Sequence, residues 1–168
     1  MQICLQTQSS REPTLSWYDL PDEVKRLLIA AANTWEDTAQ SQEYMQQALA
    51  IAGHSLDVLV AAYRYFFYKH NDIAALQIAN QVIEQIRQIE GLPEDWNRLA
   101  PLLSQGKEDP NMRLYLTAYA ASGLILARLG QIEQATVITT RVSEIDTKRE
   151  FGAATVLQVL THPEDEED

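Results

Sequence analysis

The sequence predicts an all-α protein built from antiparallel helical hairpins, and three observations support this prediction. Glycine and proline, six of each, are too few in 168 residues for a turn-rich β protein. Apolar residues recur at three- and four-residue steps along most of the chain, which is the period of one helix face. Gly53, Gly91 and Gly130 interrupt this pattern, and glycine commonly ends helices.

The chain is expected to contain one domain with a short segment at each end. We predict an N-terminal arm over residues 1–18, a single helical domain over residues 19–161 and an acidic disordered tail over residues 162–168. The N-terminus lacks the basic and apolar regions of a secretory signal. No stretch approaches the ~18 apolar residues that span a bilayer. We therefore expect a cytoplasmic protein that does not bind membranes.

The first hairpin is predicted over residues 19–53. Asp19 is expected to cap its first helix, because Pro21 then falls in the first turn, where proline is tolerated. The expected buried stripe of this helix comprises Val24, Leu27, Leu28, Ala31, Trp35 and Thr38. Ser41 is expected to begin the second helix, which would end at Gly53.

Residues 55–90 predict a second hairpin, on which the rest of the chain is expected to pack. Ser55 is expected to cap its first helix and Asp72 its second, with a tight turn over residues 70–72. The inward residues of the first helix are Leu56, Leu59, Ala62, Tyr63, Phe66 and Phe67. The second helix carries two adjacent stripes, which are mostly apolar: Ile73, Leu76, Ala79, Ile83, Ile86 and Glu90, and Ala75, Ile78, Val82 and Ile89. This width is typical of a helix that packs on two sides.

The remaining chain predicts a short helix and then a third hairpin. Residues 93–103 are expected to be helical and residues 104–110 to form a polar loop. Asn111 is expected to begin a long helix, which turns at Gly130 into another helix. The pattern Thr-x-x-Glu over residues 147–150 is that of a capping box, so we expect it to open a last helix.

Residues 123–135 resemble a tetratricopeptide repeat, a helix-turn-helix unit of about 34 residues. Gly123 and Ala135 match the small residues where the two helices of that repeat cross. Gly130 matches the turn glycine, and Ile132 the large residue that opens the second helix. The resemblance implies a short, right-handed, tetratricopeptide-like (TPR-like) array of stacked hairpins with a C-terminal capping helix. A plain helical bundle is the alternative.

The same frame can be placed on residues 55–90. Asn71 then takes the place of the turn glycine, and Ile73 takes that of Ile132. Arg64 and Leu76 fall where the family has small residues. The second hairpin is therefore expected to be a degenerate version of the third.

The resemblance implies a non-catalytic protein–protein interaction module, either an adaptor or a dedicated chaperone. In TPR-like proteins the first helix of each pair lines a concave face that holds a peptide or helix of a partner. Tyrosine and arginine are favoured at such contacts. The residues expected on this face are Tyr65, Tyr68, Arg64, Lys69, Tyr115 and Tyr119. Whether a neighbouring hairpin buries these tyrosines instead is left open.

Composition and motifs argue against several other functions. The net charge of −11 argues against nucleic acid, because phosphate binding needs clustered lysine and arginine. The histidines, His54, His70 and His162, lack the spacing of metal ligands, and no phosphate loop or nucleophile elbow occurs. We expect no enzyme, no cofactor and no metal. Two alternatives are kept: a closed bundle that binds a small apolar ligand or acts as an enzyme or regulatory subunit, and a tyrosine face that forms a homodimer.

Overall fold

The computed structural model describes residues 19–161, which contain eight α-helices and no β-strand, so the predicted all-α class is confirmed. The helices are α1 (Asp22–Asn33), α2 (Thr38–Ala52), α3 (Leu56–Tyr68), α4 (Asp72–Glu90), α5 (Trp96–Gln105), α6 (Pro110–Arg128), α7 (Ile132–Ile145) and α8 (Ala153–Thr161). The predicted arm over residues 1–18 and tail over residues 162–168 lie outside the described residues.

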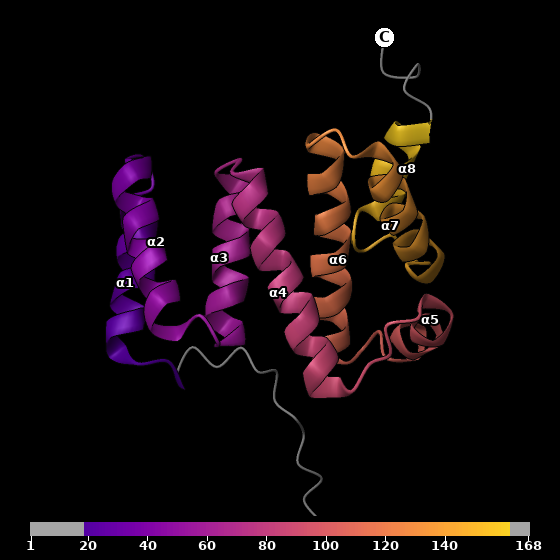
Figure 1. The fold of residues 1–168 in the computed structure, drawn as a ribbon, viewed down its shortest axis with the longest axis horizontal. Coiled ribbons are helices and arrows are strands. Elements are labelled where there is room, and N and C mark those ends of the chain that lie inside the picture. Colours follow the sequence, from indigo (N-terminus) through magenta and orange to yellow (C-terminus); the bar gives the residue numbers. More distant parts are fainter. Residues whose placement is uncertain (1–18, 162–168) are drawn as a thin grey trace, which may run out of the picture.

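The helices form a row of antiparallel hairpins (Figure 1). The pairs α1–α2, α3–α4 and α6–α7 each pack along their length, and α8 packs against α7. Helix α4 also packs directly against α6, although α5 separates them in the sequence. Helix α5 lies to one side of the row, where it contacts α7 (Figure 1). The TPR-like hand and repeat of this row stay a prediction.

Helix α4 has the wide buried face that its two apolar stripes predicted. Ala75, Ala79, Val82 and Ile86 are fully buried, and they serve the contacts with both α3 and α6. Ile73 and Ile89 were assigned to the same stripes but are 63% and 49% exposed. Each lies in a terminal turn of α4, where the neighbouring helices no longer cover it.

The boundary inside the first hairpin differs from the prediction. Helix α1 is preceded by Pro21 rather than capped by Asp19, and it ends at Asn33. Trp35 therefore lies in the turn and is 37% exposed, so it is not part of the α1 stripe. Helix α2 begins at Thr38, because the Asp37 carboxylate accepts a hydrogen bond from the backbone N–H of Gln40 at 3.2 Å.

Ser41 is a core residue and does not begin a helix. Its side chain is fully buried, and its hydroxyl donates a 2.8 Å hydrogen bond to the carbonyl oxygen of Ala31 in α1. This bond satisfies a buried hydroxyl that would otherwise oppose folding. The prediction was wrong because a serine at a helix start and a serine at a helix crossing give the same sequence pattern.

Two other helices begin one residue before the predicted position. Asn71, and not Asp72, caps α4 by accepting a 3.3 Å hydrogen bond from the N–H of Ala74. Helix α6 begins at Pro110 because the Asp109 carboxylate caps it. In both cases a polar residue just upstream competes successfully for the capping position.

The second and third hairpins share the same turn geometry. His70 and Gly130 are both left-handed, with φ of 57° and 80°. The residue after each turn donates its N–H to a carbonyl five residues earlier: Asn71 to Phe66 and Gln131 to Leu126, both at 2.9 Å. These are the bonds of a Schellman helix end. His70, and not Asn71, thus corresponds to Gly130, and the predicted register was wrong by one residue.

The corrected register restores a small residue at one of the two crossing positions of the second hairpin. Ala75 now corresponds to Ala135, and both are fully buried. Tyr63 corresponds to Gly123, whereas Arg64 is exposed and takes no part in the crossing. The second hairpin therefore keeps a small residue on its second helix and has a large residue on its first.

The turn at His70 predicts a stabilising substitution. A left-handed conformation costs a non-glycine residue about 1–2 kcal/mol, and a glycine in its place avoids this strain. Glycine also loses more chain entropy on folding, which cancels about half of the benefit. We expect His70→Gly to raise the free energy of unfolding by about 0.5–1 kcal/mol. Gly130→Ala should lower the free energy of unfolding by a similar amount, because alanine is strained at this left-handed position. The loss should not be larger, because no atom lies within 4 Å of an added Cβ. Urea unfolding of both variants measures this, and a destabilised His70→Gly would contradict it.

Candidate functional site

A groove lies between α3, α6 and the start of α8, with a volume of about 470 Å³. We call it the α3–α6–α8 groove. Its lining residues are Tyr63, Arg64, Phe67, Tyr68, Thr117, Ala120, Ala121, Leu124, Phe151, Gly152 and Val156. Helices α3 and α6 are the first helices of their hairpins, as predicted for a partner-binding face.

Two of the six predicted site residues lie together in this groove. Tyr68 is 66% exposed at its edge, and Arg64 is also exposed. The Tyr68 ring meets the Phe67 ring edge-on, with centroids 5.4 Å apart. Phe67 is in turn covered by the Arg128 guanidinium at 4.6 Å. The aromatic rim of the groove is thus held in place from the side of α6.

Tyr65 does not face the groove, which corrects the predicted pairing with Tyr68. Its side chain is 7% exposed and packs edge-on against Trp35 and Phe66, at centroid distances of 5.6 and 5.2 Å. The turn between α1 and α2 covers this side of α3 and makes Tyr65 part of the core. The sequence could not show this, because it gives no information on where the first hairpin sits.

Lys69 is also directed away from the groove. Its ammonium group lies 4.0 Å from the centre of the Trp35 ring and donates hydrogen bonds to the Trp35 carbonyl oxygen and the Thr38 hydroxyl. Lys69 therefore joins the end of α3 to the turn of the first hairpin. This structural role replaces the predicted role in partner binding.

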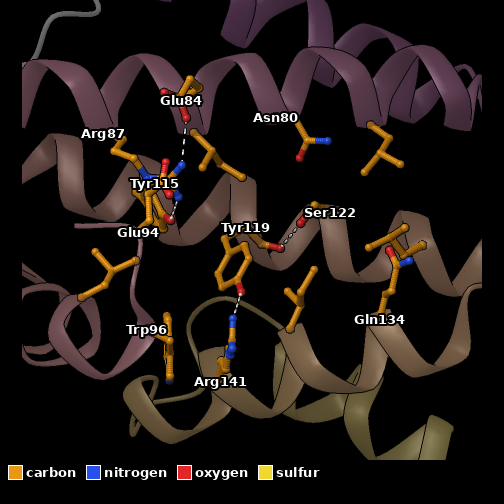
Figure 2. Close-up of a pocket in the computed structure, with 15 residues that line it drawn as sticks. Asn80, Glu84, Arg87, Glu94, Trp96, Tyr115, Tyr119, Ser122, Gln134 and Arg141 are labelled. Atoms are coloured by element: carbon orange, nitrogen blue, oxygen red, sulfur yellow. Dashed lines mark hydrogen bonds and ion pairs between the residues drawn. The ribbon is translucent and has the colours of Figure 1, made fainter. Parts of the chain in front are cut away.

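Tyr115 and Tyr119 line a different cavity, between α4, α5, α6 and α7 (Figure 2). We call this space of about 410 Å³ the polar cavity. It is lined by Leu76, Asn80, Ile83, Glu84, Arg87, Glu94, Trp96, Leu99, Tyr115, Tyr119, Ser122, Leu126, Gln134, Ile138 and Arg141. The two tyrosines do not extend the α3–α6–α8 groove, because they project from α6 toward α4 and α7.

An ion pair forms part of one wall of the polar cavity. Arg87 forms a 2.8 Å ion pair with Glu84 and donates a 3.3 Å hydrogen bond to the hydroxyl of Tyr115, which is 2% exposed. Burial raises the pKa of Tyr115, although Arg87 acts in the opposite direction. Burial acts to lower the pKa of Arg87, but Tyr115 and Glu84 together raise it. The phenol therefore stays neutral and the guanidinium charged at neutral pH.

A second arginine stands on the opposite wall. The Arg141 guanidinium lies 5.0 Å from the Trp96 ring centre and donates a 3.2 Å hydrogen bond to the Tyr119 hydroxyl (Figure 2). The Trp96 and Tyr119 rings are 6.0 Å apart, and the Tyr119 and Tyr115 rings are 5.9 Å apart. Sequence reasoning did not identify Arg141, because the tyrosine and arginine that meet here are 22 residues apart.

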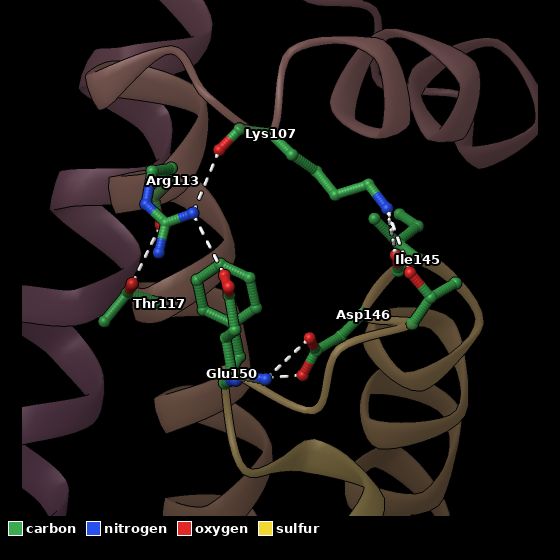
Figure 3. Close-up of polar contacts among 8 residues, drawn as sticks. Lys107, Arg113, Thr117, Ile145, Asp146 and Glu150 are labelled. Carbon is green, nitrogen blue, oxygen red and sulfur yellow. Dashed lines mark hydrogen bonds and ion pairs between the residues drawn. The ribbon is translucent and has the colours of Figure 1, made fainter.

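The side of the α3–α6–α8 groove that α8 lines depends on the turn between α7 and α8 (Figure 3). The predicted capping box over residues 147–150 does not form there. Instead the buried Asp146 carboxylate accepts hydrogen bonds from the N–H groups of Glu150 and Phe151, at 2.7 and 2.8 Å. These bonds fix the backbone at Phe151. Gly152 follows with a left-handed φ of 74°, and α8 begins at the next residue.

Two basic residues attach this turn to the rest of the protein (Figure 3). Arg113 of α6 forms a 3.1 Å ion pair with Glu150, and its guanidinium lies 5.4 Å from the Phe151 ring centre. Lys107 donates a 2.9 Å hydrogen bond to the Ile145 carbonyl oxygen. The contribution of α8 to the groove was missed because these contacts join segments far apart in the sequence.

Residues 19–161 contain no group of three histidine, cysteine, aspartate or glutamate side chains placed to hold a metal ion. None of the helices in this range has the length and apolar character needed to cross a membrane.

Comparison with known proteins gives one informative relative. The chain is 33% identical over 144 residues to a protein of Azotobacter chroococcum mcd 1 described as an uncharacterized 19.8 kDa protein in the nifW 5' region. The match covers 84% of this chain and 80% of the relative. No family model matches the chain. No solved structure gives a significant match.

Proposed function

The chain belongs to the family of the Azotobacter chroococcum 19.8 kDa protein, and we propose that it is a protein–protein interaction module. The module works without catalysis, as an adaptor or dedicated chaperone. It binds a peptide or helical segment of a partner in the α3–α6–α8 groove. The description of the relative names no activity, so the proposal rests on the geometry of the groove.

The observation that carries this proposal is the exposure of Tyr68. A tyrosine that is 66% exposed beside a hollow of about 470 Å³ offers a large, rigid contact surface at little entropic cost. Tyrosine is among the residues that contribute most to binding at protein interfaces. On the same groove Arg64 supplies the hydrogen-bond donors for a carboxylate or a backbone carbonyl of the partner.

The small residues of α6 also support a bound segment. Ala120 and Ala121 line the groove between the aromatic edge of α3 and Phe151. Because alanine has no side chain beyond Cβ, a partner backbone approaches α6 closely there. Its apolar side chains then contact Phe67 and Phe151. A helix or extended segment with one or two apolar anchors fits this arrangement.

Site-specific crosslinking tests the proposal. A photoreactive phenylalanine is introduced in place of Tyr68, and in a control in place of Ile73, which is 63% exposed in the same hairpin but does not line the groove. We expect a crosslinked partner from residue 68 only. The crosslinked peptide, once synthesised, should bind the Tyr68→Ala variant at least about tenfold more weakly than the native chain.

Two outcomes would overturn the proposal. Equal crosslinking from residues 68 and 73 would mean that exposure alone determines the contact. A crosslink from residue 68 to a second copy of the same chain would favour the homodimer alternative instead.

A further inference from the structure

We propose that the polar cavity between α4, α5, α6 and α7 binds a small zwitterion, namely an α-amino acid with an apolar side chain. The inference concerns a second site, on the other side of α6 from the α3–α6–α8 groove, and it does not depend on the proposed function. It rests on the charges that line the cavity, on the two aromatic rings that hold one of its arginines, and on the cavity volume.

The cavity contains one cation and one anion that other side chains do not neutralise. Arg141 forms no ion pair with a carboxylate among residues 19–161; its contacts are the Trp96 ring and the Tyr119 hydroxyl. Glu94, on the segment before α5, likewise has no basic partner within the described chain. A guanidinium with free N–H donors is suited to a carboxylate, and a free carboxylate is suited to an ammonium group.

The other two charges of the cavity cancel each other. Arg87 and Glu84 form an ion pair at 2.8 Å, so neither is available as the main partner of a ligand. The uncompensated charges are therefore one positive and one negative, on separate elements. A simple anion would pair with Arg141 and make no use of Glu94. A zwitterion is the class of ligand that complements both charges at once.

Arg141 is already fixed in position before a ligand arrives. Its guanidinium stacks on Trp96 and bonds to Tyr119, and these two rings lie 6.0 Å apart (Figure 2). A donor that is held in this way loses little conformational freedom on binding.

The apolar part of the lining accommodates a side chain. Leu76, Leu99 and Ile138 line the cavity together with the Trp96 ring. Its volume of about 410 Å³ falls within the range of about 300–1,000 Å³ found for small-molecule sites. The cavity thus combines one apolar region with two opposite charges, which matches an amino acid with a branched aliphatic or aromatic side chain.

Calorimetric titration of the full-length chain tests this inference. Each proteinogenic amino acid is titrated separately, followed by phenethylamine, which lacks the carboxylate of phenylalanine, and 3-phenylpropionate, which lacks its ammonium group. We expect at least one apolar amino acid to bind, and the two analogues to bind at least tenfold more weakly than phenylalanine. If 3-phenylpropionate bound as tightly as phenylalanine, the site would recognise the carboxylate alone, and the proposal of a zwitterionic ligand would be overturned.

Two variants locate the site, with a matched control. Arg141→Gln and Glu94→Gln should each weaken amino-acid binding at least tenfold. Arg128→Gln is the control, because Arg128 also stacks on an aromatic ring but does not line the polar cavity. Glu94 is exposed, so its variant is expected to fold even if Arg141→Gln does not. Absence of binding by every amino acid, or unchanged binding by Glu94→Gln, would overturn the inference.

Discussion

Replacing Gly123 with valine is expected to destabilise the protein by about 2–3 kcal/mol, because α6 and α7 cross at this glycine. A Cβ atom placed there would lie 3.1 Å from methyl carbons of both Ile138 and Thr139. Both neighbours are β-branched and have little rotational freedom with which to yield. Valine adds two further methyl groups and is itself stiff, so the helices must separate. The urea concentration at the unfolding midpoint measures this loss.

The control for this variant is Gln81→Val, in the middle of α4 and exposed to solvent. It introduces the same β-branched side chain without a helix crossing, so it should cost only a few tenths of a kcal/mol. If Gly123→Val were as stable as Gln81→Val, the close approach of α6 and α7 would not limit the size of residue 123.

Replacing Asp146 with alanine is expected to cost about 2–3 kcal/mol and to detach α8 from the rest of the protein. The carboxylate accepts two backbone hydrogen bonds and is 4% exposed. Hydrogen bonds to a charged group contribute about 1.5–3 kcal/mol each, and water replaces part of what is lost at this turn. Unfolding by urea gives the free energy, and hydrogen exchange reports whether the amides of α8 lose protection.

Asp109→Ala provides the matched control. Asp109 also accepts two backbone N–H groups, from Asn111 and Met112, at the start of α6. Its hydrogen bonds all lie within residues 106–113, so its loss should cost about 1 kcal/mol and leave α8 protected. Equal protection of α8 in both variants would contradict the role assigned to Asp146. Because Phe151 lines the groove, Asp146→Ala should also weaken binding there.

The sequence predicted the helices well and their contacts poorly, for a physical reason. Helix periodicity is a local property, and the stripe of Ala75, Ala79, Val82 and Ile86 in α4 is visible from the sequence alone. The partner of each stripe is not local. Tyr65 and Tyr68 each lie between a phenylalanine and a basic residue in the sequence, yet Trp35 covers Tyr65 and leaves Tyr68 exposed.

The candidate site was predicted in part for the same reason. Arg64 and Tyr68 were assigned to one surface and do lie on one groove. Tyr115 and Tyr119 were assigned to the same surface, but a helix such as α6 that packs on several neighbours presents different residues to each. The register error arose because Asn71 was matched to the turn glycine, whereas His70 adopts the left-handed conformation there.

The direct packing of α4 on α6 has a consequence for how this protein family can diversify. Helices α4 and α6 are neighbours in the row of hairpins, so residues 92–109 form an insertion between them in the sequence. Yet this insertion brings Glu94, Trp96 and Leu99 to the polar cavity. Leu99 and Leu103 of the same insertion are buried in the hydrophobic core, so they contribute to the scaffold itself. Substitutions at its exposed positions, such as Glu94, would therefore change the lining of the cavity at little cost in stability, whereas substitutions at the two leucines would not.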